Sequence, residues 1–214
     1  DSRLPIDGLK IGRRVSMTPF VFVWPYALVF WVVYAWAFFP EFRIVWRGLK
    51  TDRKGAASQD ARSMQVIVLG MWIGLGAAFP LAHIARFAFT GAARAGAFWA
   101  GTALLVAGSL LRRHCWRVLG EYFTGNVQTV SGQRVIDRGA YCYVRHPSYT
   151  AGIMMFLGIG IALGSWLSAL VTLLSSAGVY AYRVGIEERA LASALGQPYI
   201  DYMKTRKRFV PFVI

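Results

Sequence analysis

The sequence predicts an all-α, polytopic membrane protein with about five transmembrane helices and a cytosolic C-terminal region. Apolar residues make up 56% of the 214 positions, and the mean hydropathy is +0.44. Residues 17–39 contain no charged side chain, and about 20 apolar residues suffice to cross a bilayer core. Residues 150–182 form a second uncharged stretch, 33 residues long. Stretches of this length are typical of membrane spans.

The five predicted spans follow one another along the chain. The first covers 17–39, which is too long for the apolar region of a cleaved signal peptide. The second covers 64–82, and the third covers 95–111. The stretch 150–182 is too long for one span, and Gly164-Ser165-Trp166 offers a turn, so we divide it into a hairpin of two short helices. A single long tilted helix is the alternative.

Basic residues predict how these spans are oriented. The net charge is +14, and 18 of the 24 Lys and Arg residues fall in segments 40–63, 112–149 and 183–214. Five spans place these three segments on one side, which the positive-inside rule assigns to the cytosol. Clusters of this kind are typical of membrane-helix flanks, so we expect membrane lipids and not nucleic acid as partners. The chain begins with Asp1, which suggests a trimmed N-terminus. The sequence does not predict the oligomeric state.

A further helix is predicted beyond the last span. The segment RVGIEERALASAL has apolar residues at Val184, Ile186, Leu191 and Leu195. Gly196 is placed to end this helix, and Pro198 follows it. We expect the helix to continue from the last span and to be cytosolic or interfacial.

The triplet Arg145-His146-Pro147 stands at the start of the fourth predicted span. Proline is favoured at the first helical position, and it pushes the residue before it toward an extended conformation. Arg145 and His146 therefore lie just outside the helix, at its cytosolic end. That end suits an anionic group, although a helix start with an arginine that snorkels to lipid phosphate is an equal alternative.

Two acidic residues, Glu187 and Glu188, follow the uncharged stretch closely. Lipid headgroups explain acidic side chains at a membrane face less easily than basic ones. Arg183 precedes Glu187 by four residues, so the two can meet on one helix face. They form either a surface ion pair or a carboxylate and a guanidinium directed at a ligand.

Other motifs predict no site. Cys115 and Cys142 lack a CxxC spacing, and the three His residues are scattered, so we expect neither a disulfide framework nor a metal. The segments GIGIALG (158–164) and GLG (74–76) lie inside predicted spans and follow no strand, so they do not indicate a dinucleotide loop. Small residues in membrane helices allow close packing instead.

The C-terminal half resembles the isoprenylcysteine carboxyl methyltransferase family of integral membrane proteins. The family pattern is RHPxY, a helical hairpin, a Glu-Glu pair, FGxxYxxY and a closing Arg-x-x-Pro. Here these motifs are Arg145-His146-Pro147-x-Tyr149, Glu187-Glu188, Leu195-Gly196-x-x-Tyr199-x-x-Tyr202 and Arg208-x-x-Pro211. The resemblance covers about residues 112–214, with Leu195 in place of the usual Phe. The first hundred residues match only as apolar spans.

The resemblance implies methyl transfer from S-adenosyl-L-methionine to a lipid-like acceptor, such as the carboxylate of an isoprenylcysteine or a related isoprenoid. It implies Arg183, Glu187 and Arg145 as catalytic residues, with Arg183 contacting the substrate. The implied cofactor contacts are Gln128 (or Asn126), Gln133, Arg134, Val135, Ile136, Tyr141, His146, Pro147, Ser148, Tyr149, Glu187 and Glu188. The segment 133–136 departs from the family's His-x-Leu-Val. Residues 1–214 then form a single membrane domain, with three spans in 1–111 and a catalytic region with the hairpin and the tail in 112–214.

Three alternatives remain open. A phospholipid or other small-lipid N- or S-methyltransferase shares the same motifs. An NADPH-dependent sterol-type reductase resembles the RHPxY region but needs a larger set of spans. A non-catalytic membrane protein that keeps the fold is the third. We expect a bacterial or archaeal inner membrane, with the catalytic face in the cytosol.

Overall fold

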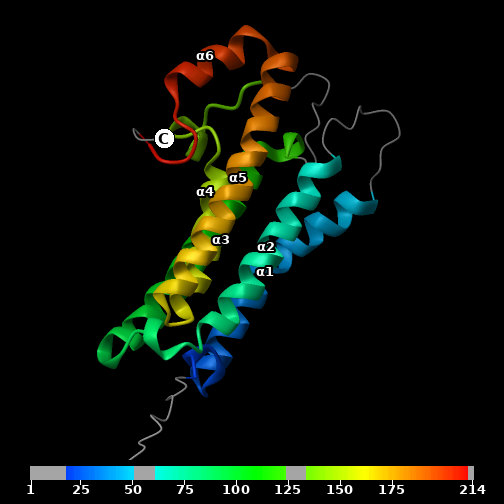
Figure 1. The fold of residues 1–214 in the computed structure, drawn as a ribbon. Coiled ribbons are helices and arrows are strands. Elements are labelled where there is room, and N and C mark those ends of the chain that lie inside the picture. Colours follow the sequence, from blue (N-terminus) through cyan, green and yellow to red (C-terminus); the bar gives the residue numbers. More distant parts are fainter. Residues whose placement is uncertain (1–17, 51–60, 124–133, 212–214) are drawn as a thin grey trace, which may run out of the picture.

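The computed structural model describes residues 18–50, 61–123 and 134–211, and this part of the chain is helical (Figure 1). The longer helices run side by side, and a short helix lies across one end (Figure 1). They are α1 (Tyr26–Lys50), α2 (Ala61–Leu81), α3 (Gly91–Leu119), α4 (Pro147–Ala162), α5 (Trp166–Leu195) and α6 (Gln197–Thr205). Helix α4 packs between α3 and α5, α2 packs against α5, and α1 contacts α3.

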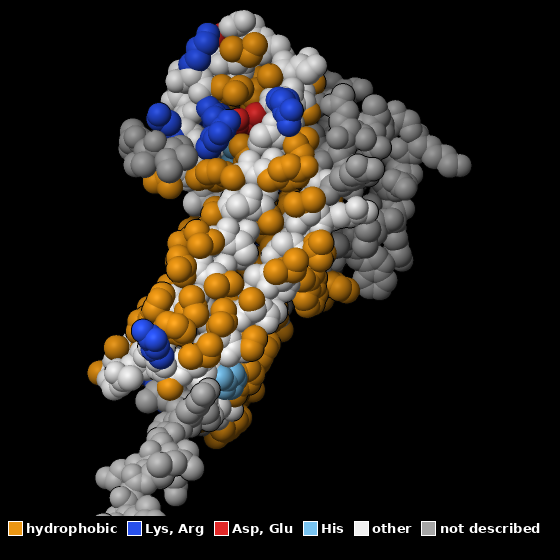
Figure 2. Space-filling model, viewed as in Figure 1, with side chains coloured by type: hydrophobic (Ala, Val, Ile, Leu, Met, Phe, Trp, Pro, Cys, Tyr) orange, Lys and Arg blue, Asp and Glu red, His pale blue; other side chains and the backbone are white. Residues whose placement is uncertain are grey.

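The all-α membrane fold class is confirmed. Helices α2, α3 and α5 are long and apolar enough to cross a membrane, and α4 and the 26–42 part of α1 are shorter apolar helices. Large apolar side chains such as Leu69, Trp72 and Leu174 are mostly exposed. Figure 2 shows hydrophobic side chains along the length of the bundle, with Lys and Arg gathered toward the α6 end. The chain is a multi-pass integral membrane protein.

The first helix begins later than predicted. We expected a span from residue 17, whereas α1 begins at Tyr26 and a 3₁₀ turn occupies Phe20–Phe22. Pro25 accounts for the difference, because proline lacks an N–H and the residue before it avoids the helical conformation. The helix also continues beyond 39, through Pro40 to Lys50.

The third helix ends later than predicted. Its apolar part stops at 111, but α3 continues to Leu119, where Gly120 with φ 56° ends it. Arg112 and Arg113 do not break the helix, since arginine favours the helical conformation, and both guanidiniums also have acceptors. Arg112 forms an ion pair with Glu41, and Arg113 donates to the Trp36 carbonyl at 2.6 Å.

The predicted hairpin within 150–182 is confirmed, and the alternative of one long tilted helix is wrong. Helix α4 ends at Ala162, and α5 begins at Trp166. Gly164 has φ 75°, a conformation that side chains other than glycine rarely adopt. The Ser165 hydroxyl accepts a hydrogen bond from the Ser168 N–H and caps α5.

Gly158 and Gly160 of the GIGIALG segment serve helix packing, as predicted, whereas Gly164 of the same segment forms the turn. A Cβ atom on Gly158 would lie 2.7 Å from the Gly101 carbonyl oxygen, and one on Gly101 would lie 2.3 Å from the Ala162 nitrogen. Helices α3 and α4 therefore approach each other too closely for any side chain at these positions.

The tail helix is also confirmed, since α5 continues without a break to Leu195 and Gly196 ends it with φ 63°. Pro198 lies in the first turn of α6, which the sequence did not predict. The chain then returns to the start of α4, where Val144 and Lys207 form a parallel bridge. The C-terminal ends of α1, α3 and α5 lie toward the same end of the bundle, as five spans require (Figure 1).

Candidate functional site at the start of helix α4

Helix α4 begins as the triplet predicts. Pro147 occupies its first turn, and His146 precedes it with φ −125° and ψ 55°, outside the helical region. His146, Pro147 and Ser148 are all buried. Tyr149 stacks on the His146 ring on one side and on the Tyr180 ring on the other, with ring centroids 5.6 and 4.8 Å apart. The start of α4 is therefore a packed interior site.

A buried carboxylate, Glu188, joins α5 to this helix start. Its Oε1 accepts from Arg145 Nε at 2.9 Å and lies 3.2 Å from His146 Nε2. Its Oε2 accepts from Arg208 Nε at 3.0 Å and Nη2 at 2.8 Å. Glu188 is only 3% exposed. We call Arg145, His146, Glu188 and Arg208 the clasp.

Backbone contacts hold the C-terminal segment against the clasp. The Arg145 and His146 N–H groups donate to the carbonyls of Lys207 and Arg208 at 2.8 and 3.0 Å. The Tyr202 hydroxyl donates to the Tyr141 carbonyl at 2.6 Å. Burial is the main cause that raises the pKa of Tyr202, so this hydroxyl keeps its proton at neutral pH. The segment after α6 is thus fastened to the residues that precede α4.

Glu187, the neighbour of Glu188, belongs to a second cluster. The Tyr149 hydroxyl donates to Glu187 Oε2 at 2.5 Å and accepts from Arg183 Nε at 3.4 Å. Arg183 also donates to the Ser63 hydroxyl of α2 and is only 3% exposed. The surface ion pair considered for Arg183 and Glu187 is therefore wrong. We call Tyr149, Arg183 and Glu187 the polar mouth.

The polar mouth borders a cavity of about 530 Å³ between α1, α2, α4 and α5. This volume lies within the range of ordinary ligand pockets. Most of the lining is apolar, including Met71, Leu75 and Phe156. Phe42 and Trp72 also line the cavity although they are 62% and 72% exposed, so the cavity reaches the outer surface of the bundle. In a membrane that surface faces lipid.

The sequence analysis missed two polar residues of this cavity, Arg112 and Glu41. They form an ion pair between α3 and α1, and Arg112 Nη1 donates to the Ser148 carbonyl at 2.7 Å. The available signal was the position of Arg112 directly after an apolar run. A glutamate in the first helix had no such signal, because nothing local indicates that an arginine 71 positions later will face it.

The segment 134–138, which precedes helix α4, lines a second cavity, also of about 530 Å³. Arg134, Val135, Ile136, Asp137 and Arg138 line it together with the end of α3. Gln128 and Gln133, like Asn126, lie outside the described residues. Tyr141 is buried, and burial followed by the nearby Cys115 and Glu187 raises its pKa.

The described residues contain no group of three or more His, Cys, Asp or Glu that is arranged to hold a metal ion. Cys115 and Cys142 are both free thiols. The chemistry that the site offers therefore comes from guanidinium, carboxylate, phenol and imidazole groups at the boundary of an apolar cavity.

Comparison with known proteins agrees with the motifs. The model of the isoprenylcysteine carboxyl methyltransferase (ICMT) family matches residues 101–193. Protein-S-isoprenylcysteine O-methyltransferase B of Arabidopsis thaliana is 26% identical over 115 residues, which cover 53% of this chain and 58% of that protein. The Protein-S-isoprenylcysteine O-methyltransferase of Tribolium castaneum is 30% identical over 115 residues, covering 53% of this chain and 41% of the relative. The matched region thus spans about half the length of these relatives.

A solved structure shows the same fold. The eukaryotic intramembrane Ras methyltransferase ICMT aligns with a TM-score of 0.60 and 21% identity, covering 91% of this chain and 70% of that one. The structural match therefore extends into the first hundred residues, where the sequence shows only apolar spans. Residues 101–193 therefore resemble the isoprenylcysteine carboxyl methyltransferase family in sequence, and 91% of the chain shares the fold of a solved member of that family.

Proposed function

We propose that the protein transfers a methyl group from S-adenosyl-L-methionine to the carboxylate of a lipid-like acceptor, such as an isoprenylcysteine or a related isoprenoid. One observation carries the proposal. An apolar cavity that reaches the lipid-facing surface ends at two guanidinium groups, that of the half-buried Arg112 and that of the buried Arg183. An amphiphile with an apolar chain and an anionic head matches this arrangement.

The residues beside the polar mouth fit the cofactor by their chemistry. When bound, S-adenosyl-L-methionine supplies a methyl group on a cationic sulfonium, next to an amino acid and an adenosine. Glu187 offers a carboxylate to a cationic group. Arg134, Val135 and Ile136 line the adjoining cavity. We therefore assign the cofactor to the space between segment 134–141 and the start of α4.

Three residues have distinct functions in this proposal. Arg183 orients the acceptor carboxylate through its planar guanidinium, which Tyr149 and Ser63 hold in place. Glu187 binds the cofactor. Arg145, which we expected to be catalytic, is engaged by Glu188 and by the Met203 and Arg206 carbonyls, so we propose that it positions the helix start.

The reaction needs alignment more than acid–base chemistry. A carboxylate with an ordinary pKa is ionised at pH 7, so its oxygen is already nucleophilic. Holding it in line with the methyl group converts an encounter between two molecules into a step within one complex. A largely apolar, preorganised cavity with a fixed guanidinium supplies that alignment.

The Arg183 guanidinium favours a carboxylate over an amine as acceptor. Arg183 repels an ammonium headgroup, whereas Glu41 already neutralises Arg112 as its counter-ion. We therefore place phospholipid amine methylation second. In our proposal residues 1–111 contribute the lipid-facing wall, residues 112–214 contribute the catalytic region, and the catalytic face lies in the cytosol.

The proposal is tested with the purified full chain and isotopically labelled S-adenosyl-L-methionine. The acceptors offered are a farnesylated cysteine with a free carboxylate, its preformed methyl ester, and phosphatidylethanolamine. We expect label only in the free carboxylate, as an ester that mild base removes. Label in phosphatidylethanolamine would replace the acceptor assignment, and no label in any acceptor or in a total lipid extract would contradict methyl transfer.

A further inference from the structure

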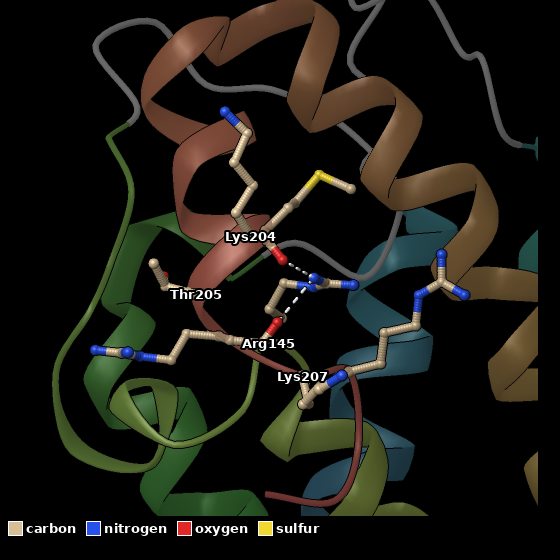
Figure 3. Close-up of a pocket in the computed structure, with 7 residues that line it drawn as sticks. Arg145, Lys204, Thr205 and Lys207 are labelled. Atoms are coloured by element: carbon tan, nitrogen blue, oxygen red, sulfur yellow. Dashed lines mark hydrogen bonds between the residues drawn. The ribbon is translucent and has the colours of Figure 1, made fainter. Parts of the chain in front are cut away.

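The segment that follows the clasp is strongly basic. Residues 204–208 read KTRKR, so four of five side chains are cationic, and we call this segment the basic strap. Together with Arg145 and Met203 it lines a cavity of about 280 Å³ below the end of α6 (Figure 3). Figure 3 shows the Arg145 guanidinium directed at two backbone carbonyls, those of Met203 and Arg206. The Arg145 guanidinium therefore binds backbone carbonyls of the protein, and the other cationic side chains that line this cavity are those of the basic strap.

The strap lies level with the membrane boundary. Lys207 and Arg208 accept backbone hydrogen bonds from Arg145 and His146, the last residues before α4 enters its uncharged stretch. The next carbonyl, that of Phe209, accepts from the Thr150 hydroxyl in the first turn of α4 at 2.8 Å. Val210 is 46% exposed. The chain therefore passes from cationic side chains at the membrane boundary to apolar side chains beside α4. A phospholipid has the same order, with its charged headgroup at the boundary and its acyl chains deeper in the membrane.

The acidic side chains near the strap are already engaged. Asp201 pairs with Lys204 and Asp137 with Arg206, both as exposed contacts that stabilise little. Glu188 is shared between Arg145 and Arg208. Lys207 is exposed, and within the described part of the chain it has no ion pair.

A donor at the strap is also unmatched. Arg206 Nε is buried and, within the described residues, has no hydrogen-bond acceptor. A buried donor without a partner costs about 1–3 kcal/mol, so an anionic oxygen at this position would be favoured. Excess cations thus line a cavity at the membrane boundary, and an unmatched donor lies in the same segment.

We propose that the basic strap binds the phosphate of an anionic phospholipid headgroup. Basic residues immediately beside a membrane helix attract anionic lipids with about 1 kcal/mol per cation near the surface. A lipid source is favoured over free phosphate because the strap continues into Val210 and because it lies beside the first residues of a membrane helix. The bound lipid holds the strap against the start of α4, and it is distinct from the methyl acceptor in the cavity between α1 and α5.

The test uses the full chain in nanodiscs of phosphatidylcholine, with and without phosphatidylglycerol, and a third sample of phosphatidylcholine with inorganic phosphate. The rate of trypsin cleavage after Arg206 and Arg208 reports how well the strap is held. The variant K204Q/K207Q removes two exposed charges but keeps both cleavage sites. The variant R117Q/R189Q is the control, since it removes two exposed arginines from the ends of α3 and α5.

We expect phosphatidylglycerol to slow cleavage in the wild type and in the control. The strap variant should bind phosphatidylglycerol about 30-fold more weakly, which corresponds to about 2 kcal/mol for two lysines. In the wild type, raising the salt concentration should remove the protection, because exposed charges are screened.

Four outcomes would overturn the proposal. They are no slowing by phosphatidylglycerol, equal losses in the two double variants, equal protection by inorganic phosphate, and protection that high salt leaves unchanged. The wild-type measurements stand on their own if the strap variant does not fold. S-adenosylhomocysteine affinity should be the same in both variants, so a failure of the methyltransferase proposal is recognised separately.

Discussion

Two neighbouring carboxylates, Glu187 and Glu188, lie in opposite environments. Glu188 is buried in the clasp, where Arg145, His146 and Arg208 surround it. Glu187 is half-buried and accepts a hydrogen bond from Tyr149. Successive residues of a helix point about 100° apart, so one turn of α5 faces both the tail and the polar mouth.

The difference separates a structural carboxylate from one that a ligand can reach. Both oxygens of Glu188 are occupied by donors of the chain itself. A second oxygen of Glu187 remains for a ligand, and its one partner within the described residues is a hydroxyl that Arg183 also contacts. Both glutamates were predicted to contact the cofactor. In our proposal only Glu187 does so, and Glu188 stabilises the fold.

The largest expected effect follows from breaking the clasp. Glu188→Ala leaves three basic side chains without their buried carboxylate, which costs about 3–5 kcal/mol of unfolding free energy. For a chain of this size that lowers the unfolding midpoint by roughly 10 °C, measured by heating in detergent. Glu187→Ala is the control, with an expected loss of about 1 kcal/mol. Equal losses would show that the two carboxylates are not structurally distinct.

The second-largest effect is expected for a substitution in the polar mouth. Arg183→Lys keeps the charge but loses the planar pair of donors, so we expect kcat/KM to fall about 100-fold. Affinity for S-adenosylhomocysteine should not change. Arg189→Lys, an exposed position on the same helix, is the matched control. A loss of cofactor affinity in Arg183→Lys would place this residue on the cofactor instead of the acceptor.

The arrangement of helices was predictable where local chemistry decides it. Pro147 starts α4, Gly164 turns the hairpin, and Gly196 ends α5, because proline and glycine restrict or extend backbone freedom at single positions. The ends of α1 and α3 were not predictable from apolar runs. Helix α3 continues for a further eight residues beyond 111 because arginine favours the helical conformation, and an apolar run marks only the part of a helix that faces lipid.

The sequence predicted which residues belong to the site but not which of them contact one another. The motifs named Arg145, His146, Tyr149, Arg183 and both glutamates, yet only tertiary structure divides them between clasp and mouth. Arg208 was known only as part of a closing motif, and its contact with Glu188 crosses from the tail to α5. Long-range ion pairs of this kind have no local signature.

A smaller effect is expected for a substitution of Glu187 that removes its charge. Glu187→Gln keeps the shape and removes the charge, so affinity for S-adenosylhomocysteine should fall about tenfold, as for one charge-assisted hydrogen bond. Isothermal titration with the full chain measures it. The unfolding midpoint should stay within a few degrees of the wild type. Wild-type affinity in this variant would remove Glu187 from the cofactor site.

The smallest effect is expected at Tyr149, which contacts both the clasp and the polar mouth. Tyr149 stacks on His146 of the clasp and bridges Arg183 and Glu187 of the mouth with its hydroxyl. Tyr149→Phe keeps the stacking and removes the bridge, which is worth about 1 kcal/mol. We therefore expect kcat/KM to fall about fivefold and the unfolding midpoint to fall by only a few degrees, while Tyr149→Ala should lower both further. A thermal loss in Tyr149→Phe as large as that in Tyr149→Ala would mean that the hydroxyl, and not the ring, joins clasp and mouth.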